Sequence, residues 1–172
     1  SAYWFIYEHP VLTQVGSPNM EYLLANAERF QKSIGAERVN EKIATAFDLQ
    51  LTNMITGRDR QSGMEAIDKV EKEMEKYEFP SKSRLKLFVE IARVQKSGDV
   101  EKLLQVCEKN IPQIEHEHLL AMFFPLSLTI KRNGNEDQQQ RILKLAKTLL
   151  AETTNDKFKF SLGQFIPYAL EK

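Results

Sequence analysis

The sequence predicts an all-α protein of about eight helices, folded as antiparallel helix hairpins. Apolar residues recur three and four positions apart through most of the chain, which places them on one face of a helix. No stretch shows the sustained alternation of apolar and polar residues, rich in β-branched side chains, that is typical of strands. With 172 residues, of which 42% are hydrophobic, the chain is long enough to bury a core.

The first expected helix has signals for both its beginning and its end. Ser17 can cap the free amides of the first turn, and Pro18 suits the first helical position because that amide has no partner anyway. Gly35 can adopt the left-handed conformation that ends a helix. These residues predict a helix over 17–35.

Each later helix is predicted from its own apolar stripe and from the turn or capping residues beside it. Cys107 belongs to one of these stripes. The segment 117–132 is apolar on nearly all sides, so we expect the most buried helix there, with a kink or break at Pro125. The expected helices and stripes cover 39–55, 67–77, 81–97, 99–111, 117–132, 142–149 and 158–169.

Two glycine turns suggest a helix-hairpin repeat. Gly98 and Gly134 lie 36 residues apart, and each is followed by an amphipathic helix. Tetratricopeptide units repeat at about 34 residues and related two-helix units at about 40. The sequence therefore leaves two arrangements open, a tetratricopeptide-like right-handed array and a compact helical bundle.

Composition excludes several functional classes. Lys and Arg total 24, as do Asp and Glu, so no basic field favours nucleic acid. No apolar run is long enough for membrane insertion, and we expect no cofactor and no metal. The chain begins within an apolar segment, so we interpret residues 1–172 as a single all-helical domain excised from a longer protein.

The candidate reactive and metal-binding residues are few. Cys107, the single cysteine, cannot form a Cys-x-x-Cys pair and falls on an apolar helical stripe, so we expect a buried core residue. His116 and His118 are two residues apart, whereas helical metal ligands lie three or four apart. We therefore interpret this segment as a solvated first helical turn, and we predict no catalytic residue.

An aromatic cluster near the N-terminus has two interpretations. So many large apolar side chains should not be left in water, so either they pack inward or they contact a neighbouring domain. The candidate domain-junction residues are Tyr3, Trp4, Phe5 and Tyr7.

The N-terminal block resembles the helical region that follows the thioredoxin-fold domain in thioredoxin-like, disulfide-isomerase-type proteins of anaerobic gut bacteria. The resemblance covers about the first 45 residues and rests mostly on caps and core positions. The residues that carry it are Trp4, Ile6, Ser17, Pro18, Tyr22, Leu23, Leu24, Asn26, Phe30, Gly35, Val39, Glu41, Lys42 and Ile43.

This resemblance implies an exported, periplasmic parent with an upstream thioredoxin domain that carries its own Cys-x-x-Cys. Cys107 does not match that motif and takes no role from it. The chain would then be a non-catalytic accessory domain that contacts the upstream domain and protein or peptide clients. The alternatives are an independent tetratricopeptide-like peptide-binding scaffold unrelated to redox chemistry and, less favoured, a helical enzyme with a buried polar site.

Overall fold

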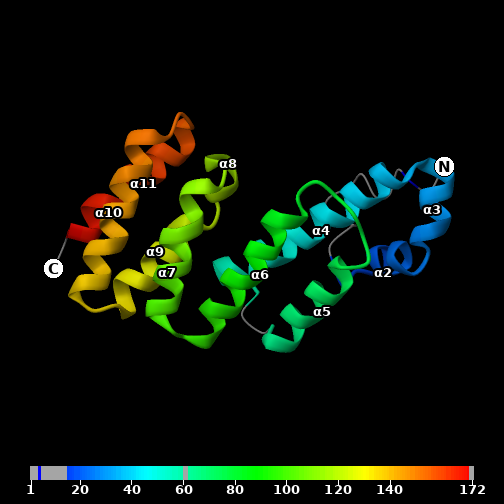
Figure 1. Ribbon diagram of the computed structural model, residues 1–172, viewed down its shortest axis with the longest axis horizontal. Helices are drawn as coiled ribbons and strands as arrows, with labels where there is room; N and C mark the ends of the chain where they lie inside the picture. Colours follow the sequence, from blue (N-terminus) through cyan, green and yellow to red (C-terminus); the bar gives the residue numbers. More distant parts are fainter. Residues whose placement is uncertain (1–3, 5–14, 60–61, 171–172) are drawn as a thin grey trace. The chain divides into compact units, whose positions relative to one another are not determined.

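The computed structural model describes Trp4, residues 15–59 and residues 62–170, and in these ranges the chain is helical without strands. The predicted all-α fold is thus confirmed for the part of the chain that is described. Figure 1 labels the α-helices in chain order. The elements are α2 (Pro18–Ala25), α3 (Ala27–Ile34), α4 (Ala36–Thr56), α5 (Met64–Met74), α6 (Lys82–Ser97), α7 (Val100–Asn110), the 3-10 helix η2 (Ile111–Gln113), α8 (His116–Leu119), α9 (Phe123–Asn133), α10 (Glu136–Glu152) and α11 (Asp156–Leu170).

The described chain has ten α-helices where the sequence predicts about eight, because two expected helices are each divided. The helix expected over 17–35 is interrupted at Asn26, where φ is −119° and ψ is 22°. The side-chain amide of Asn26 donates to the Tyr22 carbonyl at 2.9 Å. This bond gives the backbone an alternative to a continuous helix.

The segment 117–132 is divided before its proline. Helix α8 ends at Leu119 and α9 begins at Phe123, so Pro125 is the third residue of the new helix. An amide in the first turn has no partner within the helix, so the proline removes no helical hydrogen bond there. The expected break is therefore present, but it lies between Leu119 and Phe123, upstream of Pro125.

Ser17 caps its helix as the sequence predicts, and Asp99 caps the start of α7 in the same way. The Met20 amide donates to Ser17 Oγ at 3.2 Å, and the Lys102 amide donates to Asp99 Oδ1 at 3.0 Å. At the start of α10, Asn135 and Gln138 form a reciprocal capping box, with both hydrogen bonds at 2.9 Å. These bonds fix where each helix begins.

The two glycine turns that suggested a repeat require glycine for different reasons. Gly98 has φ of +72°, which disfavours any side chain. At Gly134 an added Cβ would lie 2.6 Å from the Ile130 carbonyl oxygen, so the limit there is close approach of the backbone. The turns are similar in position but not in conformation, and whether the hairpins form an array or a bundle stays a prediction.

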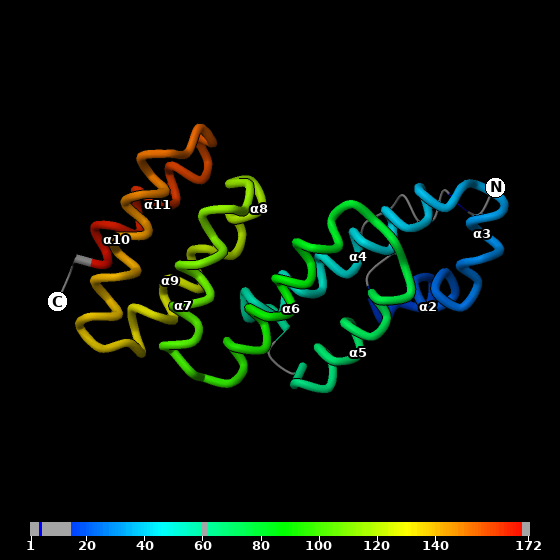
Figure 2. The backbone as a smooth tube through the Cα atoms, viewed as in Figure 1, coloured from blue at the N-terminus to red at the C-terminus, as the bar shows by residue number. Residues whose placement is uncertain are grey.

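The contacts within the chain define two compact units. Unit 1 consists of Ser1–Asn53 and Ser62–Val89, and unit 2 of Met54–Gln61 and Glu90–Lys172. In unit 1, Arg84 of α6 donates to Asp48 of α4 at 3.0 Å, and Figure 2 shows these helices running side by side. Asn40 links α3 to the segment after α5 by accepting from Gln31 and donating to the Glu78 carbonyl. The largest fully buried side chains of unit 1 are Met20, Leu23, Ile43, Phe47, Leu51, Ile67, Met74 and Phe88.

Unit 2 contains the antiparallel hairpin of α10 and α11, which lie side by side in Figure 1. Phe123 of α9 packs edge to face against Phe158 and Phe165 of α11, with ring centroids 5.9 and 6.4 Å apart. On the outer side, Arg141 of α10 binds Glu101 and Glu108 of α7 at 3.0 and 2.7 Å. An aromatic core and a charged clamp thus join the helices of unit 2.

Candidate functional site

Trp4 is the one member of the N-terminal aromatic cluster that lies within the described residues. Its side chain is only 4% exposed, its ring centroid lies 6.1 Å from that of Phe30, and the Arg38 guanidinium lies 5.6 Å from the Trp4 ring. Trp4 therefore packs inward, as the first interpretation expects. Tyr3, Phe5 and Tyr7 lie outside the described residues, and a domain-junction role stays a prediction.

Cys107 is fully buried in unit 2, as its place on an apolar stripe predicts. Burial raises the pKa of the Cys107 thiol to about 12, and the charge of Glu108 adds to this effect. The thiol is therefore protonated at neutral pH, and the thiolate is the form that attacks a disulfide. The single cysteine of this chain is not positioned for thiol-disulfide exchange.

The side chains of His116 and His118 diverge, as their spacing predicts. The His116 ring packs on Phe158 with 5.4 Å between centroids. The Nε2 atom of His118 instead lies 3.4 Å from Glu115 Oε2 and 3.6 Å from Glu117 Oε1. The two histidines therefore share no site.

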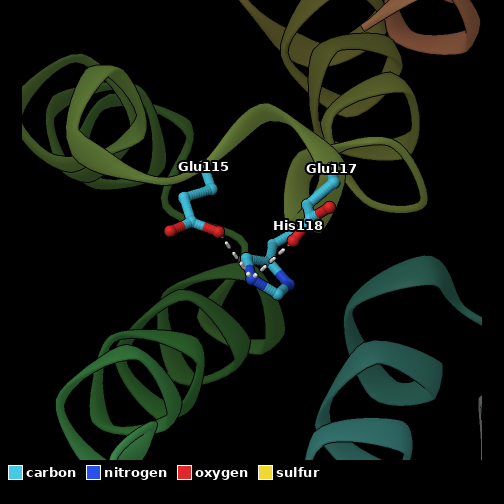
Figure 3. A group of neighbouring side chains, drawn as sticks. All are labelled: Glu115, Glu117 and His118. Atoms are coloured by element: carbon cyan, nitrogen blue, oxygen red, sulfur yellow. Dashed lines mark ion pairs between the residues drawn. The ribbon is translucent and has the colours of Figure 1, made fainter.

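Figure 3 shows both carboxylates directed toward the same imidazole nitrogen of His118. One potential ligand atom from each of the three residues lies within 4.8 Å of the others. The spacing of the two histidines did not indicate this group, because the imidazole of His118 pairs with carboxylates and not with His116. The available signal was the separation of three residues between Glu115 and His118, since an N-cap and the third residue of a helix face each other.

A pocket of about 430 Å³ opens among α2, α4 and α5 of unit 1. Leu24 and Ala66 are half-buried and supply apolar surface, whereas Phe47 and Val70 lie buried behind the wall. Its size falls within the range of about 300–1,000 Å³ that is typical of ligand sites. No sequence motif indicated this pocket, because its wall is built from three helices that meet only in the folded chain.

The polar groups of this pocket are only partly satisfied. The side-chain carbonyl oxygen of Gln50 is buried, and no group in the described chain donates to it. Lys76 binds Glu73 at 2.7 Å, and this hydrogen bond is the largest cause of the raised pKa of Lys76. Glu21 and Lys69 have no ion-pair partner among the described residues. The pocket is thus flanked by two exposed charges of opposite sign, and the buried carbonyl oxygen of Gln50 in its wall has no donor within the described chain.

Comparisons of the chain with family models, curated proteins and solved structures found no match. Among the described residues, no helix combines the length and apolar character that a membrane span requires. The candidate functional features are therefore the pocket of unit 1 and the cluster of Glu115, Glu117 and His118.

Proposed function

We propose that this chain is a non-catalytic helical interaction domain that binds protein or peptide segments in the pocket of unit 1. The observation that carries the proposal is the combination of apolar surface with the unsatisfied carbonyl oxygen of Gln50. A buried acceptor without a donor costs about 1–3 kcal/mol. A ligand that brings an N–H group recovers this cost.

A segment of an unfolded polypeptide suits these features. It supplies apolar side chains for the half-buried surface of Leu24 and Ala66 and backbone N–H groups for Gln50. The terminal amide of a glutamine turns about a broad torsion, so its oxygen can be presented to a bound chain. Glu21 and Lys69 can pair with charges of either sign on the ligand.

We further propose that the domain is an accessory to a thioredoxin-like, disulfide-isomerase-type protein, in an exported, extracytoplasmic parent. The resemblance over residues 4–43 supports this assignment. The protonated, buried thiol of Cys107 is consistent with it, because the redox cysteines would then belong to the upstream domain. The isolated chain should show no disulfide reductase or isomerase activity, whereas the parent with its upstream domain should show it; activity in the isolated chain contradicts the proposal.

The pocket equally favours an independent peptide-binding scaffold without any redox connection. The coding sequence of the parent distinguishes the two functions. An upstream thioredoxin segment with Cys-x-x-Cys would support the accessory role. A parent without such a segment would support the independent peptide-binding scaffold.

Binding itself is tested by fluorescence anisotropy with a fluorescein-labelled twelve-residue peptide that has leucine and phenylalanine at its centre. Leu24→Lys replaces apolar surface of the pocket by a charged group and should weaken binding at least about tenfold, because the ligand then loses an apolar contact worth about 1.5–3 kcal/mol. Leu49→Lys on α4 is the matched control, since Leu49 is 37% exposed and does not line the pocket. Equal binding by wild type and Leu24→Lys would contradict the proposal.

A further inference from the structure

The cluster of Glu115, Glu117 and His118 in unit 2 brings together three groups that can ligate a metal ion. Glu115 precedes α8 with φ of −56° and ψ of 133°, and this extended backbone leads into the first turn, which carries the other two residues. In Figure 3 the two carboxylates approach His118 Nε2 from different sides. The donor set is one imidazole nitrogen and two carboxylate oxygens.

The distances are longer than those of hydrogen bonds. A charge-assisted N–H···O bond has about 2.7–2.9 Å between its heavy atoms. His118 Nε2 lies 3.4 and 3.6 Å from the two carboxylate oxygens. A single imidazole nitrogen also carries at most one proton, so it cannot donate a full hydrogen bond to both carboxylates.

The two distances from His118 Nε2 match the separation of ligands around a small divalent ion. Nitrogen and oxygen ligands lie about 2.0–2.2 Å from Zn²⁺, and in a tetrahedron this places them about 3.3–3.6 Å from one another. Two carboxylates held within 4.8 Å of each other also repel, and a cation between them would relieve that repulsion.

We propose that Glu115, Glu117 and His118 form a binding site for a divalent transition-metal ion of the Zn²⁺ class. The imidazole nitrogen favours such an ion over Mg²⁺ or Ca²⁺, which prefer six or more oxygen ligands. Three protein ligands leave the fourth position of a tetrahedral ion to water. The side chains are 76%, 67% and 28% exposed, so the ion can enter from solvent without any opening of the fold.

Isothermal titration of the full 172-residue chain with ZnCl₂ tests this site. Wild type should bind with a saturable heat, and His118→Asn should weaken binding at least about tenfold. Glu115→Gln and Glu117→Gln should each weaken it as well. His116→Asn is the matched control, because His116 is a neighbouring imidazole that faces Phe158, and its substitution should leave binding unchanged.

A second measurement needs no variant. Co²⁺ added to isotope-labelled wild type should broaden the amide resonances of residues 115–118 before those of other segments. Absence of saturable Zn²⁺ binding overturns the proposal. So does binding that survives in His118→Asn, binding that is lost equally in His116→Asn, or Co²⁺ broadening that is centred elsewhere.

Discussion

The two units use their aromatic and charged residues differently. In unit 2, Phe123 packs edge to face against both Phe158 and Phe165, and Arg141 binds acidic side chains of α7. In unit 1, the pocket leaves Glu21 and Lys69 unpaired within the described chain. Charges that are already paired hold helices together, whereas exposed charges beside a pocket are available to a ligand.

The largest expected effect is in the aromatic core of unit 2. Phe158→Ala should lower the free energy of unfolding by about 3–5 kcal/mol, because Phe158 is only 1% exposed and its removal leaves a cavity. Urea denaturation followed by circular dichroism measures this loss. Phe160→Ala is the matched control on the same helix, since Phe160 is 70% exposed and should change stability little. Similar losses for the two variants would contradict the described core.

In unit 1, by contrast, Gln50→Leu should stabilise the fold. It removes a buried carbonyl oxygen that has no donor in the described chain, so the free energy of unfolding should rise by about 1 kcal/mol. The same variant should bind the labelled peptide more weakly. A variant that is more stable but binds the peptide more weakly would show that Gln50 serves binding and not the fold. A destabilised Gln50→Leu would show that the carbonyl oxygen already serves the fold.

The ionic clamp of unit 2 should contribute less than its core. Arg141→Met should lower the free energy of unfolding by about 1 kcal/mol at low salt, since partly exposed ion pairs are individually weak even in a network. The loss should shrink at high salt because ions screen the clamp. Arg132→Met is the control, because Arg132 is exposed without an ion pair among the described residues. A salt-independent loss would point to packing of the Arg141 stem instead.

The same clamp predicts a dependence on pH. Hydrogen bonds from Gln138, Arg141 and Gln105 hold the pKa of Glu101 below its ordinary value of 4.5. A carboxyl with a lowered folded pKa stabilises the fold above its unfolded pKa and loses that contribution as pH falls through the folded pKa. The melting temperature should therefore fall on acidification below about 4.5. The melting temperature of Arg141→Met should fall less steeply with decreasing pH than that of wild type. Identical pH profiles for the two proteins would contradict a stabilising role of the clamp.

Local elements were predictable because their signals lie close together in the sequence. Ser17 and Asp99 sit within three residues of the amides they cap, and the apolar stripe that includes Cys107 follows one helix face. The interruption at Asn26 was missed because the competing side-chain bond to the Tyr22 carbonyl is a local choice that helix propensity alone does not reveal.

The pocket depends on the approach of segments that are distant in sequence. Leu24, Gln50 and Val70 come from three helices, and nothing in their local patterns shows that a gap remains among them. The cluster at His118 was easier to predict from the sequence, because its three residues lie within four consecutive positions. It was missed because the orientation of Glu115 depends on the backbone just before α8.

One NMR experiment reports peptide binding at the pocket of unit 1 and in unit 2 at the same time. Isotope-labelled protein is titrated with the unlabelled form of the twelve-residue peptide, and amide chemical shifts are followed by NMR. If the peptide binds in the pocket, the shifts should be concentrated around Leu24, Gln50 and Val70, and the amides of α10 and α11 should be unchanged. Shifts centred on α10 and α11, or no shifts at saturating peptide, would contradict the assignment of binding to unit 1.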